Sequence, residues 1–236
     1  MTTKGKSIIL ALAGLSLTAA APAQDFFKKL NAGEPQTVVL YGTSLTAEGA
    51  WATAMRQWFD EKYPGQVRFI NSGGPGQNSD WGWQNVKTKV LDHHPDLVLI
   101  EFSYNDAHEK FNLPVKRGAE NLAKIVTAIQ EQNPATLIVL QIMNAAWDAP
   151  NGRKSLSARP RLDAFNDNYR AFAKEHGLTL LDHYPAWQEL KKKQPQKFQT
   201  YIPDGTHPDK TGSLAVTWAA IKAWLEDGVA KVEGGK

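Results

Sequence analysis

The chain has 236 residues, 42% of them hydrophobic, and is therefore long enough to bury one well-packed core. It contains no cysteine, which excludes disulfide bonds, thiolate metal sites and a cysteine nucleophile. The formal net charge of +3 includes two lysines of an N-terminal leader pattern, and without them 25 basic residues oppose 24 acidic ones. So small a net charge gives no indication of a nucleic-acid partner or of stable association with a membrane.

Residues 1–23 have the pattern of a bacterial secretory signal peptide. Lys4 and Lys6 give it a positive start, residues 8–17 are apolar, and Ala21 and Ala23 frame an A-x-A cleavage site. The apolar run is too short for a transmembrane helix. We therefore predict cleavage after Ala23, export to the periplasm or the medium, and a single domain over residues 24–236.

A short helix is expected over residues 25–30, and an apolar run at residues 38–41 then leads into Gly42. This run predicts a buried strand, and the spacing of apolar residues from Trp51 to Phe59 predicts a core-facing helix after it. Ser44 lies in the turn between the two. Open α/β sheets bind ligands at the carboxyl ends of their strands, and a helix N-terminus favours negative charge, so Ser44 is a candidate nucleophile.

Four further apolar segments predict strands at residues 67–71, 97–102, 136–142 and 178–182. Amphipathic helical patterns lie between them, and a last one follows around Ile221. Five strands that alternate with helices predict a three-layer α/β/α sandwich with a five-stranded parallel sheet. The long polar loop at residues 144–157 is of a kind that is often functional in compact domains.

Four polar segments lie just after a predicted strand or in the loop before the last helix. They are residues 42–44, the glycine-rich loop 72–76, residues 103–106 and residues 204–207. The carboxyl ends of parallel strands share one edge of the sheet, so these segments are expected to converge although they are far apart in the chain.

In these segments the sequence resembles the SGNH hydrolases, also called the GDSL esterase/lipase family. Residues 42–45 stand in place of the family's first block, 71–79 resemble the second, Asn105 and Asp106 match the third, and residues 204–208 match the last. Two positions depart from the family pattern: Thr43 replaces the usual aspartate, and Ser103 replaces the glycine of the third block. The resemblance extends from about residue 37 to residue 225 and implies the flavodoxin-like SGNH fold.

The resemblance also implies roles for five residues. Ser44 would be the nucleophile, His207 the base and Asp204 its partner, while the N–H groups of Ser44 and Gly76 and the side-chain amide of Asn105 would form the oxyanion hole. The chemistry agrees, because a serine hydroxyl needs an adjacent base, and that base needs a partner to fix its tautomer. The implied reaction is acyl transfer to Ser44, followed by hydrolysis of the acyl-enzyme.

Each of these residues also has an ordinary structural interpretation. Ser44 could only cap a helix, the glycines at 73–76 could only form a turn, and Asn105 and Asp204 are both common turn residues. Their occurrence together, in the family's order and on the expected elements, favours a catalytic site.

A metal or cofactor is not expected. Asp92, His93 and His94 are adjacent at the end of a predicted helix, which is not a usual ligand spacing, and they are better explained as solvated residues near the negative end of the helix dipole. No Walker, H-E-x-x-H or G-x-G-x-x-G string is present. His108, His176 and His183 are expected to be structural.

The expected substrate is an acylated small molecule or glycan. The variant first and second blocks resemble the carbohydrate-esterase side of the family, which indicates an acetylesterase acting on a polysaccharide or oligosaccharide. Trp81 and Trp147 lie beside the predicted site and could stack on a sugar ring, although core packing is the favoured interpretation of both. Three further functions stay open: a lysophospholipase, thioesterase or arylesterase of the same family, an exported O-acyltransferase using the same triad, and a non-catalytic glycan-binding domain.

Overall fold

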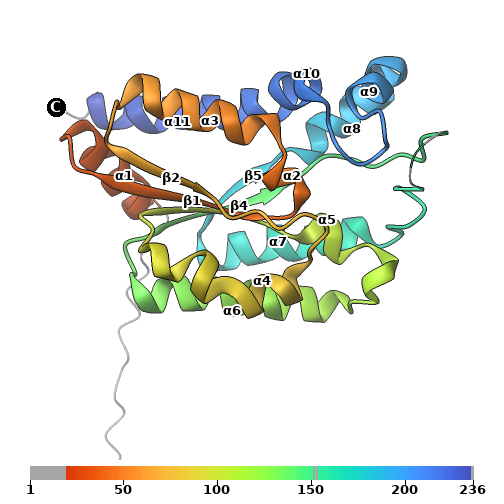
Figure 1. The fold of residues 1–236 in the computed structure, drawn as a ribbon, viewed down its shortest axis with the longest axis horizontal. Helices are drawn as coiled ribbons and strands as arrows, with labels where there is room; N and C mark the ends of the chain where they lie inside the picture. Colours follow the sequence, from red (N-terminus) through yellow and green to blue (C-terminus); the bar gives the residue numbers. More distant parts are fainter. Residues whose placement is uncertain (1–19, 151, 153, 235–236) are drawn as a thin grey trace, which may run out of the picture.

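The computed structural model describes residues 20–150, 152 and 154–234, and it builds them around a five-stranded parallel sheet (Figure 1). The strands are β1 (Gln36–Gly42), β2 (Val67–Asn71), β3 (Leu97–Glu101), β4 (Leu137–Ile142) and β5 (Thr179–Asp182). Their spatial order is β2-β1-β3-β4-β5, the flavodoxin-like order. The predicted fold class is confirmed. In this topology the chain changes direction across the sheet between β1 and β3, which is where such sheets bind ligands.

Helices cover the sheet on both sides, as the ribbon in Figure 1 shows. In chain order the helical elements are α1 (Ala20–Asn31), α2 (Ser44–Ala47), α3 (Ala50–Lys62), α4 (Ser79–Lys89), η1 (Leu91–His93), α5 (Ser103–Asp106), η2 (Glu109–Phe111), α6 (Val115–Gln132), α7 (Leu162–His176), α8 (Tyr184–Lys193), α9 (Pro195–Tyr201), α10 (Lys210–Gly212), the π-helical η3 (Ser213–Trp218) and α11 (Ala219–Glu233). Among these helices, none is long and apolar enough to cross a membrane.

The strands divide the core into two hydrophobic clusters, because successive side chains of a strand point to opposite faces. On β1, Val38 and Leu40 join one cluster with α1, α3 and α11, while Val39 and Tyr41 join the other with α4, α6 and α7. β3 and β4 alternate in the same way. Both faces of the central strands are therefore buried, which is why these strands read as continuous apolar runs in the sequence.

One feature of the fold differs from the sequence-based expectation. Helices α8 and α9 were not predicted, apart from a solvated helical face at residues 191–193, because each is short and offers few apolar positions. They pack through Trp187, Phe198 and Ile202 into a separate small cluster beside the loop that follows β4. Most of the predicted signal segment lies outside the described residues, and the first described helix, α1, begins at Ala20.

A buried histidine lies at the end of β5. His183 is only 2% exposed, its Nε2 lies 3.2 Å from Oε1 of Gln141, and burial lowers its pKa to about 4. The unfolded chain should titrate this group near its ordinary pKa of about 6.5. Between these two values the unfolded state binds a proton that the folded state does not, so the free energy of unfolding falls as the pH drops through this window.

We expect the wild-type protein to lose about 2 to 3 kcal/mol more unfolding free energy between pH 7 and pH 4.5 than a His183→Gln variant, because the variant lacks this titration. Urea unfolding of both proteins at the two pH values measures the difference. Equal losses in the two proteins would show that His183 does not carry this pH dependence.

Candidate active site

The turn between β1 and α2 presents Ser44. Strand β1 ends at Gly42, and the side chain of Thr43 caps α2 by accepting a hydrogen bond of 3.1 Å from the backbone N–H of Leu45. Ser44 is the first residue of α2, so its own N–H is one of the helix's N-terminal donors, which have no partner within the helix. The serine hydroxyl and a backbone donor are thus placed together at the carboxyl edge of the sheet.

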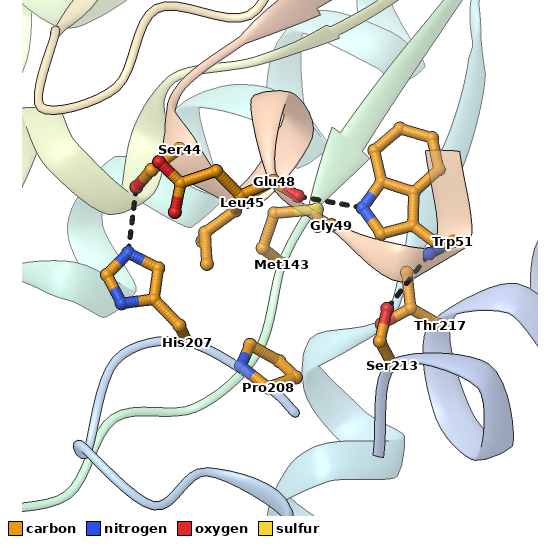
Figure 2. A pocket seen from close by; sticks show the side chains of 10 residues that line it. All are labelled: Ser44, Leu45, Glu48, Gly49, Trp51, Met143, His207, Pro208, Ser213 and Thr217. Carbon is orange, nitrogen blue, oxygen red and sulfur yellow. Dashed lines mark hydrogen bonds between the residues drawn. The ribbon is translucent and has the colours of Figure 1, made fainter. Parts of the chain in front are cut away.

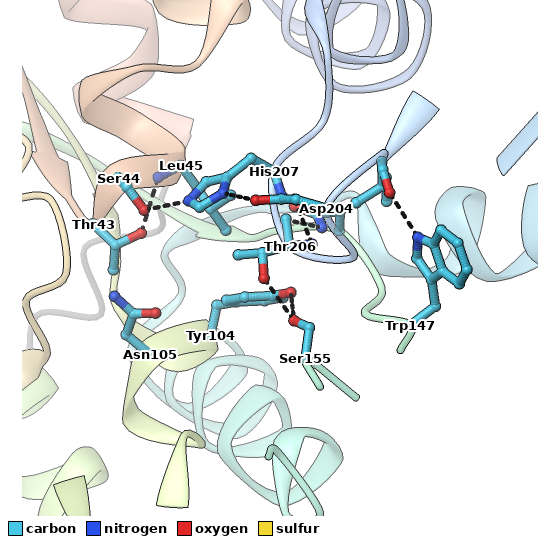
Figure 3. A network of polar contacts seen from close by, with 12 residues as sticks. Thr43, Ser44, Leu45, Tyr104, Asn105, Trp147, Ser155, Asp204, Thr206 and His207 are labelled. Atoms are coloured by element: carbon cyan, nitrogen blue, oxygen red, sulfur yellow. Dashed lines mark hydrogen bonds and ion pairs between the residues drawn. The ribbon is translucent and has the colours of Figure 1, made fainter. Parts of the chain in front are cut away.

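Three side chains form a hydrogen-bonded series here (Figure 3). The hydroxyl of Ser44 lies 2.9 Å from Nε2 of His207, and Nδ1 of His207 lies 2.7 Å from Oδ2 of Asp204. The other oxygen of Asp204 accepts the backbone N–H groups of Thr206 and His207 at 2.8 and 2.7 Å. The sequence-predicted nucleophile, base and partner are therefore brought together, in the order that activation of a serine requires.

The electrostatics suit these positions. Burial raises the pKa of Asp204, but the hydrogen bonds from His207 and Thr206 outweigh burial and hold that pKa below its usual value. Asp204 is thus an anion near neutral pH. An anion hydrogen-bonded to Nδ1 keeps a proton on that nitrogen and leaves Nε2 free to accept the proton of Ser44.

The loop after β4 holds the segment that carries Asp204 and His207. The side-chain amide of Asn144 donates to the carbonyl of Thr206 at 2.9 Å, and the backbone N–H of Trp147 donates to the carbonyl of Gly205 at 3.2 Å. Ser155 links the hydroxyls of Thr206 and Tyr104, at 2.8 and 3.0 Å. These supports were not predicted individually, although the length of the loop had indicated a function for it.

The predicted oxyanion donors lie on the other side of Ser44. Gly76 has φ +72°, in the left-handed region that favours glycine, and the loop that carries it is tied to β1 by a 2.7 Å bond from the N–H of Gly74 to the carbonyl of Gly42. The amide nitrogen of Asn105 donates to the carbonyl of Gln77 at 2.7 Å, which uses one of its two hydrogens. Ser44, Gly76, Asn105 and His207 all line one cavity of about 380 Å³.

A buried carboxyl group joins helix α5, which carries Asn105, to the start of α4 just after the loop that carries Gly76. Asp106, 1% exposed, accepts the backbone N–H of Ser79 at 2.7 Å and so anchors the start of α4, just after the glycine-rich loop. Burial raises the pKa of Asp106 to about 7, against the hydrogen bonds from Ser79. The resemblance to the family's third block includes Asp106 but implies no role for it, so this anchoring function comes from the structure alone.

Two cavities of different character meet at the Ser44–His207 pair. The smaller, about 20 Å³, combines the apolar side chains of Leu45, Trp51, Met143 and Pro208 with the polar side chains of Glu48, Ser213 and Thr217 (Figure 2). The larger, about 380 Å³, is lined by polar and charged residues that include Glu48, His108, Lys110 and Arg159. His108, expected to be structural, thus faces the site.

The two tryptophans that were candidates for sugar stacking line neither cavity. The ring of Trp81 packs against Tyr41 and Phe102, with centroids 5.9 and 6.4 Å away. The indole nitrogen of Trp147 donates to the carbonyl of Ile202 at 2.6 Å, and its ring packs against the cluster under α8 and α9. In both cases the contacts are those of core packing, the interpretation that the sequence analysis favoured over sugar stacking.

The histidine pair considered as a metal site lies away from Ser44. His93 ends the 3-10 turn η1 and His94 follows it, at the amino end of β3, whereas Ser44 lies at the carboxyl end of β1. Within residues 20–150, 152 and 154–234, no three His, Asp or Glu side chains gather closely enough to hold a metal ion. The charged groups beside Ser44 thus offer no ready cation site.

Comparison with known proteins identifies the family of this chain. A model of the GDSL-like lipase/acylhydrolase family matches residues 36–215, a range that contains all five strands and the four polar segments. A GDSL esterase/lipase of Arabidopsis thaliana is 26% identical over 223 residues, covering 80% of this chain and 86% of that protein. An arylesterase of Vibrio mimicus is 27% identical over 179 residues, and the match covers 73% of this chain and 80% of that protein.

Solved structures share the fold at lower identity. A lipase/acylhydrolase from Enterococcus faecalis superposes with a TM-score of 0.66 at 22% identity, covering 81% of this chain and 96% of its own. A two-domain esterase active on acetylated mannans superposes with a TM-score of 0.66 at 21% sequence identity, and the match covers 89% of this chain and 53% of that chain. An acetylxylan esterase from Geobacillus stearothermophilus superposes with a TM-score of 0.64 at 17% sequence identity, and the match covers 80% of this chain and 93% of that chain. Because the family model matches most of its length, the chain belongs to the GDSL-like lipase/acylhydrolase family.

Proposed function

We propose that this protein is a serine esterase that removes short acyl groups, acetyl above all, from a polysaccharide or oligosaccharide. Membership of the family supports ester hydrolysis in general. The observation that carries the finer proposal is the hydrogen-bonded series Ser44–His207–Asp204, which opens on the same cavity as Gly76 and Asn105.

The reaction would proceed through an acyl-enzyme. His207 Nε2 accepts the hydroxyl proton as Ser44 Oγ attacks the ester carbonyl, and Asp204 stabilises the imidazolium that forms. His207 then gives that proton to the departing alcohol oxygen, and the carbon–oxygen bond of the ester breaks. Water, deprotonated by the same imidazole, attacks the acyl-serine, and that proton passes to Ser44 Oγ as its bond to the acyl carbon breaks. The carboxylic acid leaves and loses its own proton to the solvent.

The negative charge of each tetrahedral intermediate would be held by the N–H groups of Ser44 and Gly76 and the amide of Asn105. Donors fixed in advance at such a position are worth about 3 to 4 kcal/mol each in known enzymes. The backbone ties at Gly74 and the bond from Asn105 to Gln77 support this role, because they fix both loops before a substrate arrives.

The small cavity suggests the acyl group. A space of about 20 Å³ is enough for one water-sized group, such as the methyl of an acetyl ester. A longer chain would extend beyond this space, where it could not gain the roughly 0.8 kcal/mol that each buried methylene otherwise provides. We therefore assign the acyl group to this cavity.

The larger cavity suits the alcohol half of the ester. Its charged and hydrogen-bonding lining, with Glu48, His108 and Lys110, fits a hydroxyl-rich sugar better than an alkyl chain. The structural neighbours that act on acetylated mannans and acetylxylan support the same substrate class. An exported enzyme, as the leader pattern predicts, would meet such polymers outside the cytoplasm.

We expect Ser44→Ala and His207→Ala each to lower kcat on an aryl acetate by at least about a thousandfold, because the triad acts as a unit, and Asp204→Ala to cost less. The folded fraction of each variant is checked by circular dichroism. His176→Ala, at the opposite edge of the sheet, is the control and should retain full activity. If Ser44→Ala or His207→Ala kept more than a tenth of wild-type activity while folded, the roles assigned to these residues would be wrong.

We expect acetyl esters to be preferred over octanoyl esters by at least about tenfold in kcat/KM, because the small cavity denies burial to added methylenes. A Met143→Ala variant should shift the preference toward butyryl esters by widening that cavity. Met55→Ala is the matched control: this equally buried methionine lines neither cavity, so its loss should change stability but not the chain-length ratio. A wild-type preference for octanoyl esters would favour a lipase or thioesterase instead.

A further inference from the structure

The end of β3 carries a carboxyl group that the proposed reaction does not use. Glu101 is completely buried and pairs in register with Gly42, the last residue of β1. Glycine at position 42 leaves room for the Glu101 carboxylate, which a Cβ there would displace. Burial raises the pKa of Glu101 to about 7, although hydrogen bonds from Thr46 and Thr43 oppose this rise. Burying an acidic group costs free energy of folding, so the contacts that Glu101 makes need an explanation.

Those contacts all lie on the turn that carries the nucleophile. Oε1 of Glu101 accepts the backbone N–H of Thr43 at 2.6 Å, the hydroxyl of Thr43 at 2.9 Å and the hydroxyl of Thr46 at 2.7 Å. The Thr43 hydroxyl in turn accepts the N–H of Leu45. One carboxylate oxygen therefore binds the residue before Ser44 and the residue two positions after it.

The turn needs such support. Helix α2 has only four residues, and a helix this short has little stability of its own. Ser44 must nevertheless present both its hydroxyl to His207 and its N–H to the reacting carbonyl. A misplacement of about 1 Å at such a site can cost a hundredfold in rate.

We propose that Glu101 is a positioning residue for the nucleophile: its buried carboxylate fixes the turn Gly42–Thr46 so that the hydroxyl and the N–H of Ser44 both face the substrate carbonyl. This inference rests on the proposed role of Ser44. It also gives a physical account of Thr43, where the family usually has aspartate. Threonine supplies a hydroxyl that donates to Glu101 while accepting from Leu45, whereas an ionised aspartate could not donate.

The test compares Glu101→Leu, which removes the acceptor, with Glu101→Gln, whose amide oxygen can still accept the Thr43 N–H. We expect Glu101→Leu to lower kcat on an aryl acetate by about a hundredfold with KM changed less than about threefold, because it misplaces Ser44 without altering the substrate cavities. The kcat of Glu101→Gln should be within about tenfold of wild type, since two of the three groups that donate to Glu101 keep an acceptor in the amide oxygen. Rates are expressed per folded molecule, from far-ultraviolet circular dichroism and thermal unfolding.

Gln141→Leu is the matched control. Gln141 is a polar side chain of similar length and equal burial on the neighbouring strand β4, but it lies beside His183 and not beside the nucleophile turn. A purely structural role for buried polar groups predicts that Gln141→Leu and Glu101→Leu behave alike, losing stability while kcat per folded molecule stays unchanged. The positioning role predicts a loss of kcat in Glu101→Leu only.

A Glu101→Leu variant with kcat within threefold of wild type would overturn the inference. Should that variant fail to fold, Thr46→Val decides, because it deletes one donor while keeping the side-chain shape. We expect about a tenfold lower kcat at unchanged KM, and an unchanged kcat would overturn the inference. Failure of the proposed function itself looks different, because Ser44→Ala would then remain active whatever the Glu101 variants do.

Discussion

The site depends on the adjacency of β1 and β3, whose last residues, Gly42 and Glu101, pair in register at the carboxyl edge of the sheet. Each strand ends there in a short helix, and those two helices carry Ser44 and Asn105. The glycine-rich loop after β2 is fastened to the same point by the bond from Gly74 to Gly42. The proposed nucleophile and oxyanion donors are therefore positioned by the most deeply buried part of the molecule, where displacement of the backbone is most costly.

The acid–base pair reaches the site differently. Asp204 and His207 lie on a loop between α9 and α10, not on a strand, and that loop is held by hydrogen bonds to the long segment after β4. The sheet thus positions the proposed nucleophile, and a separately supported loop positions the proposed base beside it. The two cavities that meet at Ser44 then separate a space suited to a small acyl group from a polar space suited to the alcohol.

The sequence predicted the parts that are encoded locally. Buried strands appear as apolar runs, and the polar residues that follow them share one edge, which made Ser44 a candidate. Asp204 and His207 follow no strand, and it was the resemblance to the family's last block that indicated them. The support from Glu101 and Asp106 could not, because it depends on contacts between segments 27 or more positions apart in the chain. Trp81 and Trp147 could not be placed for a related reason, since spacing alone does not tell whether an indole lines a site or packs beneath it.

The central claim is that Ser44 becomes acylated, and covalent labelling tests it most directly. The protein is treated with an aryl phosphonate ester, digested, and mapped by mass spectrometry, with His207→Ala treated in parallel. The account predicts one phosphonyl group, located on Ser44, in the wild-type protein, and far slower labelling of the variant because its serine lacks a base. Stoichiometric inactivation with the label on any other residue would contradict it.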